Sequence, residues 1–174
     1  MTVEVRLVSD GDAAALTAVL LANREFMAPW EPTREASYFT EQHQHDEISH
    51  GRRRFEQNLA LPCVIVYEGR IVGRINLNNI VHGVFCSADL GYWVSQEYNG
   101  RGVATAAVAA VVRRAFDELG LHRVQAGTLV HNHGSQRVLL RNGFTRIGLA
   151  PAYLRIAGRW QDHLIFQRIN ENTD

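Results

Sequence analysis

The first quarter of the chain predicts a strand and then a helix. Residues 3–7 alternate apolar and polar side chains, which is the period-two pattern of a short strand. Ser9 or Asp10 follows as a candidate N-cap, and the Ala- and Leu-rich segment after it predicts a helix that ends near Asn23. The segment from Phe26 to Pro32 contains two prolines, so we expect a loop with aromatic anchors instead of a regular helix.

A polar segment and three apolar runs follow. A surface helix is predicted to begin after Thr33 and to reach about Asn58. Strand patterns then cover Cys63 to Tyr67, Ile71 to Asn78 and about Phe85 to Val94, with a Glu-Gly turn between the first two. Short connections of this kind predict an antiparallel meander.

The second half predicts a strongly amphipathic helix from about Gly102 to Leu119, because its apolar side chains form one stripe that needs a sheet to cover. The elements expected after it are a strand from Arg123 to Leu129, a helix from about His133 to Arg141, and closing strands at about Thr145 to Tyr153 and Asp162 to Ile169. This order predicts an α/β (α+β) fold whose mixed, mostly antiparallel central sheet has about seven strands flanked by about four helices.

Composition narrows the class of protein. The 174 residues fit a single domain over 1–174, and 46% hydrophobic with 21% charged residues is ordinary for a globular chain. Eighteen basic residues balance 18 acidic ones, which gives no global field for nucleic acid or a membrane surface. All basic residues are Arg, so a catalytic lysine is excluded. The sequence shows no signal peptide and no long apolar run, so we expect a cytoplasmic protein. We expect Cys63 and Cys86 to be buried reduced thiols, with a disulfide or a catalytic cysteine as the alternative.

The loop before the amphipathic helix carries the clearest chemical signal. It reads Asn99-Gly100-Arg101-Gly102 and opens directly into the helix, whose first N–H groups and dipole form an anion site suited to a pyrophosphate. The loop follows three antiparallel strands, which disfavours a Rossmann unit, and a P-loop needs a lysine that this chain lacks. A simple tight turn is the alternative interpretation.

These residues resemble motif A of the GNAT acetyltransferase superfamily, in which this loop holds the pyrophosphate of acetyl-CoA. The later segment from Asn132 to Phe144 is similar to the family's motif B, where the Asn lies beside the pantetheine arm and the Ser near the sulfur; Ser135 is also expected to cap the helix there. The resemblance implies a V-shaped splay between strands 4 and 5 and acetyl-CoA as co-substrate. The implied cofactor-binding residues are Trp93, Val94, Ser95, Asn99, Gly100, Arg101, Gly102, Val103, Ala104, Thr105, Asn132 and Ser135.

Two further segments, residues 23–32 and 153–163, are similar to the RimJ/RimL branch, most closely to RimJ-type enzymes that acetylate an N-terminal alanine of ribosomal proteins. The resemblance implies a protein or peptide N-terminus as partner and places Glu25, Phe26, Trp30, Glu31 and Trp160 at the acceptor groove; buried anchoring is the alternative for both tryptophans. A small amine (a polyamine or an antibiotic) as acceptor, or a non-catalytic acetyl-CoA-binding module, stays open, as do monomer and homodimer.

Relatives in this superfamily transfer acetyl directly, which implies an oxyanion donor, a base and an acid. We expect a backbone N–H of residues 92–94 as oxyanion donor and Asp89 as base, directly or through water, with Glu25 and Glu31 as weaker candidates. Tyr153 or Tyr92 is the candidate acid, and Ser135 the third. About a quarter of an α-amine is neutral at pH 7.4, so the lack of an obvious base favours such an acceptor.

Three histidines, His43, His45 and His50, raise the question of a metal site. Their spacings of two and five residues do not place them on one helix face, and no cysteine or carboxylate pattern completes a set of ligands. We therefore expect no metal.

Overall fold

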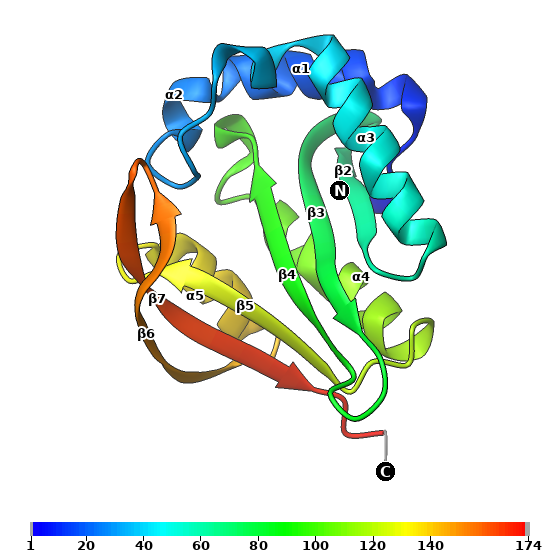
Figure 1. Cartoon of the computed structure of the whole chain (residues 1–174), viewed down its shortest axis with the longest axis vertical. Helices are drawn as coiled ribbons and strands as arrows, with labels where there is room; N and C mark the ends of the chain where they lie inside the picture. Colours follow the sequence, from blue (N-terminus) through cyan, green and yellow to red (C-terminus); the bar gives the residue numbers. More distant parts are fainter. Residues whose placement is uncertain (1, 173–174) are drawn as a thin grey trace.

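The computed structural model describes residues 2–172 and contains one seven-stranded sheet with helices on both faces (Figure 1). The strands are β1 (Val3–Leu7), β2 (Leu61–Tyr67), β3 (Arg70–Val81), β4 (Ser87–Val94), β5 (Arg123–Leu129), β6 (Thr145–Ile156) and β7 (Arg159–Ile169). The α-helices are α1 (Ala13–Ala22), α2 (Arg24–Met27), α3 (Glu41–Glu56), α4 (Val103–Asp117) and α5 (His133–Arg141). Short 3-10 helices are η1 (Asp10–Asp12), η2 (Ala36–Phe39) and η3 (Gln96–Tyr98).

The sheet order is β1-β2-β3-β4-β5-β7-β6, and every neighbouring pair is antiparallel except β4 with β5. This arrangement confirms the predicted mixed, mostly antiparallel sheet and the α/β fold class. The parallel pair is short, because β4 and β5 are in register only from Ser87 opposite Arg123 to Asp89 opposite Gln125. Beyond these three pairs the two strands diverge, as the family resemblance implied.

Alternation along β2 explains the two layers of helices. Val64 and Val66 pack with Leu16 of α1 and Ile48 of α3, whereas Cys63 and Ile65 belong to the larger core on the opposite side. That larger core contains the apolar stripe of α4, namely Val103, Ala107, Val108, Val111, Val112 and Ala115. The amphipathic pattern of α4 thus does what the sequence predicted: it covers one face of the sheet.

The structure corrects several predicted boundaries. The segment from Phe26 to Pro32, expected to be all loop, begins with the last two residues of the short helix α2, and Pro29 and Pro32 come only after that helix, where they break no helix hydrogen bond. The long helix expected after Thr33 is divided, because Thr40 is extended and caps α3 by accepting a hydrogen bond from His43 N at 3.3 Å. Expected burial holds for Cys63, but Cys86 is half-buried at the end of the β3–β4 loop.

The last two strands are longer than predicted and form one hairpin. β6 continues to Ile156 and β7 begins at Arg159, because Ala157 (φ 48°) and Gly158 (φ 80°) form a two-residue turn between them. Ala157 N also donates to Glu31 O at 3.0 Å, so this turn contacts the loop after α2. Two segments far apart in sequence therefore meet beside the β4–β5 splay (Figure 1).

Candidate active site

A cavity of about 640 Å³ opens where β4 and β5 diverge. Its wall is built from the end of β4, the loop before α4, β5, the first turns of α5, α2 with the following loop, and the ends of β6 and β7. A volume of this size is in the usual range for sites that hold small molecules. The splay of the sheet is therefore the structural cause of the candidate site.

The α4 end of the cavity is a backbone anion cradle. Gly100 (φ 76°) and Gly102 (φ 79°) are in the left-handed region, and the first intrahelical bond runs from Ala106 N to Gly102 O at 3.0 Å. Residues 103–105 consequently have N–H groups without an intrahelical acceptor at the positive end of the helix dipole. This arrangement fits a phosphate or pyrophosphate group.

The β5 wall offers an unsatisfied polar group. The Thr128 side chain is buried, lies in the cavity wall, and its Oγ1 has no hydrogen-bond partner within residues 2–172. A buried hydroxyl without a partner is uncommon in folded proteins. It fits a polar ligand, such as the amide-bearing pantetheine arm of a coenzyme A molecule, between β4 and β5.

Tyr92 and Ser135 face each other across the splay. Their hydroxyl oxygens are 2.8 Å apart, and burial raises the pKa of Tyr92 to about 12, an effect that the Ser135 hydrogen bond partly opposes. Asn132, not Ser135, caps α5, because Asn132 Oδ1 accepts from Ser135 N at 3.1 Å. The Ser135 hydroxyl therefore points to Tyr92 instead of serving as the predicted cap.

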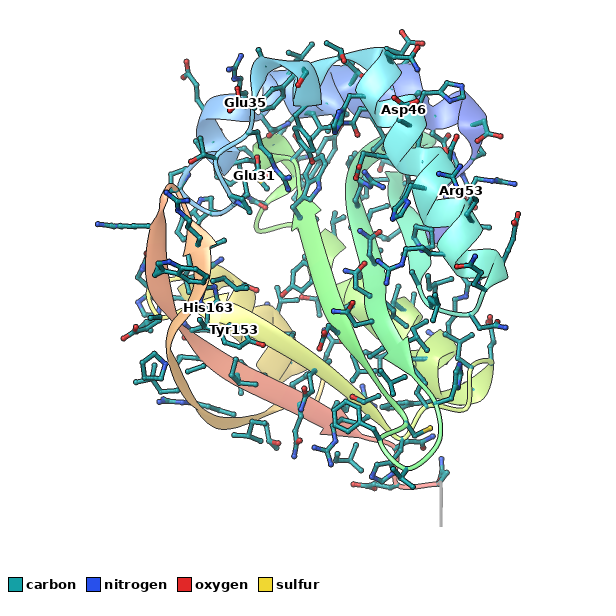
Figure 2. The ribbon with its side chains drawn as sticks, viewed as in Figure 1. Glu31, Glu35, Asp46, Arg53, Tyr153 and His163 are labelled. Atoms are coloured by element: carbon teal, nitrogen blue, oxygen red, sulfur yellow. The ribbon has the colours of Figure 1, made fainter. Side chains whose placement is uncertain are left out.

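His163 lies on the β6–β7 side of the site, with Tyr153 beside it (Figure 2). His163 is 3% exposed and lies in the cavity wall, with Nδ1 3.0 Å from Gln161 O. The Tyr153 ring packs against it, with centroids 5.6 Å apart, but Tyr153 is half exposed and is not part of the wall.

The loop after α2 supplies the remaining wall. Phe26 and Trp30 line the cavity, and the Trp30 ring lies 5.5 Å from the His131 ring. Glu31 is outside the wall; its side chain is half-buried, and burial raises its pKa against the opposing effect of Arg34. The predicted residues Glu25 and Trp160 are exposed and also lie outside the wall, Trp160 with 65% of its surface accessible.

Three other predicted residues are placed away from the cavity. Asp89 is exposed and accepts from Asn79 Nδ2 at 2.9 Å, and it does not line the wall. Ser95 is held inside the fold, where its Oγ accepts from Asn23 Nδ2 at 3.0 Å. The Arg101 guanidinium lies 5.5 Å from the Tyr98 ring centroid, outside the wall.

The other residues predicted to bind the cofactor do lie together in the wall. They are Trp93, Val94, Asn99, Gly100, Gly102, Val103, Ala104, Thr105, Asn132 and Ser135. The sequence did not predict Thr128 and His163 as site residues, because each lies in a strand that also contains other polar side chains. Only the splay and the β6–β7 hairpin bring them to the cavity.

Within residues 2–172, no helix is long and apolar enough to cross a membrane. The same residues contain no cluster of three or more His, Cys, Asp or Glu side chains arranged to hold a metal ion.

Comparison with known proteins agrees with this geometry. The sequence matches the acetyltransferase (GNAT) domain family over residues 2–145. It is 34% identical to the ribosomal protein uS5-alanine N-acetyltransferase of Escherichia coli (strain K12) over 163 residues, which are 92% of this chain and 84% of that protein. The ribosomal-protein-S5-alanine acetyltransferase from Vibrio fischeri has a TM-score of 0.95 and 32% identity, covering 100% of this chain and 96% of that one. Mycobacterium smegmatis RimJ in complex with CoA-disulfide has a TM-score of 0.94 and 34% identity, and the match covers 97% of this chain and 82% of that one.

Proposed function

The chain belongs to the GNAT acetyltransferase family and is an N-acetyltransferase, and on that premise we propose that it moves the acetyl group of acetyl-CoA directly to the N-terminal α-amine of a protein. The observation that carries the proposal is the similarity over nearly the whole chain to two enzymes named for alanine acetylation of ribosomal protein S5. A ribosomal protein is accordingly the proposed acceptor class.

The proposed place of acetyl-CoA follows from the two polar features of the cavity. The backbone cradle at residues 100–105 suits the pyrophosphate, and Thr128 offers its unpartnered hydroxyl to the pantetheine arm between β4 and β5. This course brings the thioester toward Tyr92 and Ser135, which line the same cavity. Asn132 serves the site by capping α5 and so fixing Ser135.

Val94 is the proposed oxyanion donor. Ser95 N donates to Val72 O on β3 at 2.7 Å, and successive N–H groups along a strand point to opposite sides. The N–H of Val94 is therefore directed away from β3, to the side where β5 has diverged. A backbone donor fixed in this way stabilises the negative oxygen that forms during acyl transfer.

Tyr92 is the proposed acid for the departing thiolate. Its raised pKa keeps the phenol protonated at neutral pH, and Ser135 holds the hydroxyl in place at 2.8 Å. Tyr153 and Asp89 are less well placed, because neither lines the cavity. Phe26 and Trp30 form the apolar side of the acceptor entrance, next to the contact between Glu31 and Ala157.

The test is release of the CoA thiol from acetyl-CoA with short peptides that begin with Ala, Ser or Met, and mass spectrometry of the product. Each peptide contains one internal lysine and is paired with a copy whose α-amine is blocked. Release with the unblocked peptides alone, with acetyl on the first residue, is the expected result. Release only with polyamines or aminoglycosides, or acetylation of the lysine, would contradict the proposed acceptor while leaving the acetyltransferase assignment intact.

A further inference from the structure

Within residues 2–172, no carboxylate lines the cavity, although amine acetylation releases a proton. Of the wall residues among 2–172, the ionisable ones are Tyr92, Tyr98, His131, His133, Arg137, Arg141 and His163. Phenols and guanidinium groups keep their protons at neutral pH, whereas histidine is the side chain that ordinarily exchanges one there. The base must therefore be sought among the three histidines.

His163 differs from the other two in burial and in orientation. His131 and His133 are exposed at the start of α5, but His163 is 3% exposed within the wall. Its Nδ1 lies 3.0 Å from the Gln161 carbonyl oxygen, which can only accept a hydrogen bond. Nδ1 therefore carries the hydrogen in the neutral ring, and the basic lone pair is on Nε2.

Nε2 has no hydrogen-bond partner within residues 2–172. The ring is oriented by two contacts: the Tyr153 ring on β6 packs against it, with centroids 5.6 Å apart, and Nδ1 is hydrogen-bonded to Gln161 O. The site thus contains a fixed imidazole whose lone pair is not used by the fold.

We propose that His163 is the general base of the acetyl transfer, accepting the proton of the attacking amine at Nε2. The inference rests on the proposed direct transfer. The neutral amine nitrogen attacks the thioester carbonyl carbon, an N–C bond forms, and the carbonyl π electrons move to oxygen. His163 takes one amine proton, the carbonyl re-forms as the C–S bond breaks, and the sulfur takes the Tyr92 proton. Tyr92 then regains a proton from the His163 imidazolium through solvent, which leaves an amide and the CoA thiol.

The groups around His163 are compatible with this role. On β6 the ionisable neighbour is Tyr153, while Gly127 and Leu129 on β5 bring no charge. The other ionisable groups of the cavity wall come from β4, η3, the loop before α5 and α5 itself, and they are Tyr92, Tyr98, His131, His133, Arg137 and Arg141. An imidazole base also suits an α-amine better than a lysine side chain, because the pKa values of imidazoles and α-amines are closer.

The decisive variant is His163→Asn. The asparagine amide can still donate a hydrogen bond to the Gln161 carbonyl oxygen, but it has no basic nitrogen. We expect kcat near pH 7 to fall by about 10²-fold or more, and to recover as pH rises, while KM for acetyl-CoA stays within about twofold. Added imidazole should restore part of the activity of His163→Ala. The control is His82→Gln, an exposed histidine of the β3–β4 loop outside the cavity wall, which should match wild type.

Each contrary outcome has a distinct meaning. Wild-type kcat in folded His163→Asn, or an equal loss at every pH without imidazole rescue, would overturn the base role. So would a histidine ¹⁵N spectrum in which neutral His163 is protonated at Nε2, a measurement that needs no acceptor. Acetylation by wild type of small amines alone would contradict the proposed acceptor, while the ratio of His163→Asn to wild type on that amine would still test the base.

Discussion

Asn23 and Ser95 are 72 residues apart in sequence, and their side chains meet in the buried joint between the end of α1 and the loop that leads to α4. Asn23 Nδ2 donates to Ser95 Oγ at 3.0 Å and to Val19 O at 2.8 Å, and its Oδ1 accepts from Gln96 N at 2.8 Å. Two of these three hydrogen bonds connect the acceptor-side helices to the cofactor-side loop, and the bond to Val19 O fixes the amide at the end of α1. Ser95 thus holds this loop from a position outside the cavity wall.

Replacing Asn23 by Ala should destabilise the fold by about 1 to 3 kcal/mol, because it removes the donor to the buried Ser95 Oγ and the acceptor of Gln96 N. Urea denaturation of the variant measures this change in the free energy of unfolding. Ser95→Ala should cost less, since it removes one of these bonds. A double-mutant cycle should then show a coupling of about 1 kcal/mol between the two sites, and strict additivity would contradict the proposed joint.

The sequence predicted the elements of this fold better than their ends or the site. The alternation of apolar and polar residues predicted the strands, and the apolar stripe predicted α4, because burial of one face produces a regular spacing of apolar residues along the chain. The length of the β6–β7 hairpin was missed, because it depends on an Ala157-Gly158 turn with two positive φ angles. The spacing of Gly100 and Gly102 before an amphipathic helix predicted the backbone anion cradle.

Thr128 and His163 were not predicted because nothing local marks them. Each is one of several polar side chains in its strand, and its place in the cavity wall depends on the divergence of β4 from β5 and on the hairpin that packs beside it. Asp89, by contrast, was predicted from its residue type as the base. The structure places its carboxylate at the exposed surface of β4, where it accepts a hydrogen bond from Asn79. Residue type alone does not define a catalytic site.

Gly100→Ala should weaken acetyl-CoA binding by about tenfold or more. An alanine strains the left-handed backbone at φ 76° by about 1 to 2 kcal/mol, and relief of that strain moves the N–H groups of the cradle. Gly83→Ala is a matched control, because Gly83 has φ 75° in the β3–β4 loop, outside the cavity wall. Both variants should lose similar stability in thermal denaturation, and only Gly100→Ala should lose affinity in calorimetric titration. Equal affinities would remove the cradle from the proposed site.

The ion pair of Arg6 and Asp12 should make stability depend on acid pH. Hydrogen bonds from Arg6 lower the pKa of Asp12 from 3.8 to about 2, with N–O distances of 2.8 Å. The depressed value means that the stabilisation is fully present above pH 4 and is lost as pH falls from about 4 to 2. Because Arg6 is partly exposed, we expect Asp12→Asn to cost about 1 to 2 kcal/mol at pH 7.

The free energy of unfolding of Asp12→Asn and wild type, measured by urea from pH 7 to pH 2, checks this sign. The difference should shrink toward pH 2, where the wild-type carboxylate also takes a proton. Glu118→Gln, which removes the exposed pair with Arg114, should change stability by less than about 1 kcal/mol and serves as the control. A difference that is constant with pH would mean that the Asp12 charge is not what stabilises the fold.

Tyr92→Phe should reduce kcat by about 10²-fold while acetyl-CoA affinity stays nearly unchanged, because it removes the acid but keeps the ring that packs in the cavity. Since burial raises the pKa of Tyr92 to about 12, its ionisation should cause no loss of wild-type rate below about pH 10.

Tyr38→Phe is the matched control, because Tyr38 also has a pKa raised by burial but lies outside the cavity wall. Ser135→Ala should fall between the two variants, since it leaves the phenol in place and removes only its 2.8 Å hydrogen bond. Thiol release at saturating acetyl-CoA ranks all three, and a Tyr92→Phe enzyme as fast as Tyr38→Phe would assign the protonation of the thiolate to solvent.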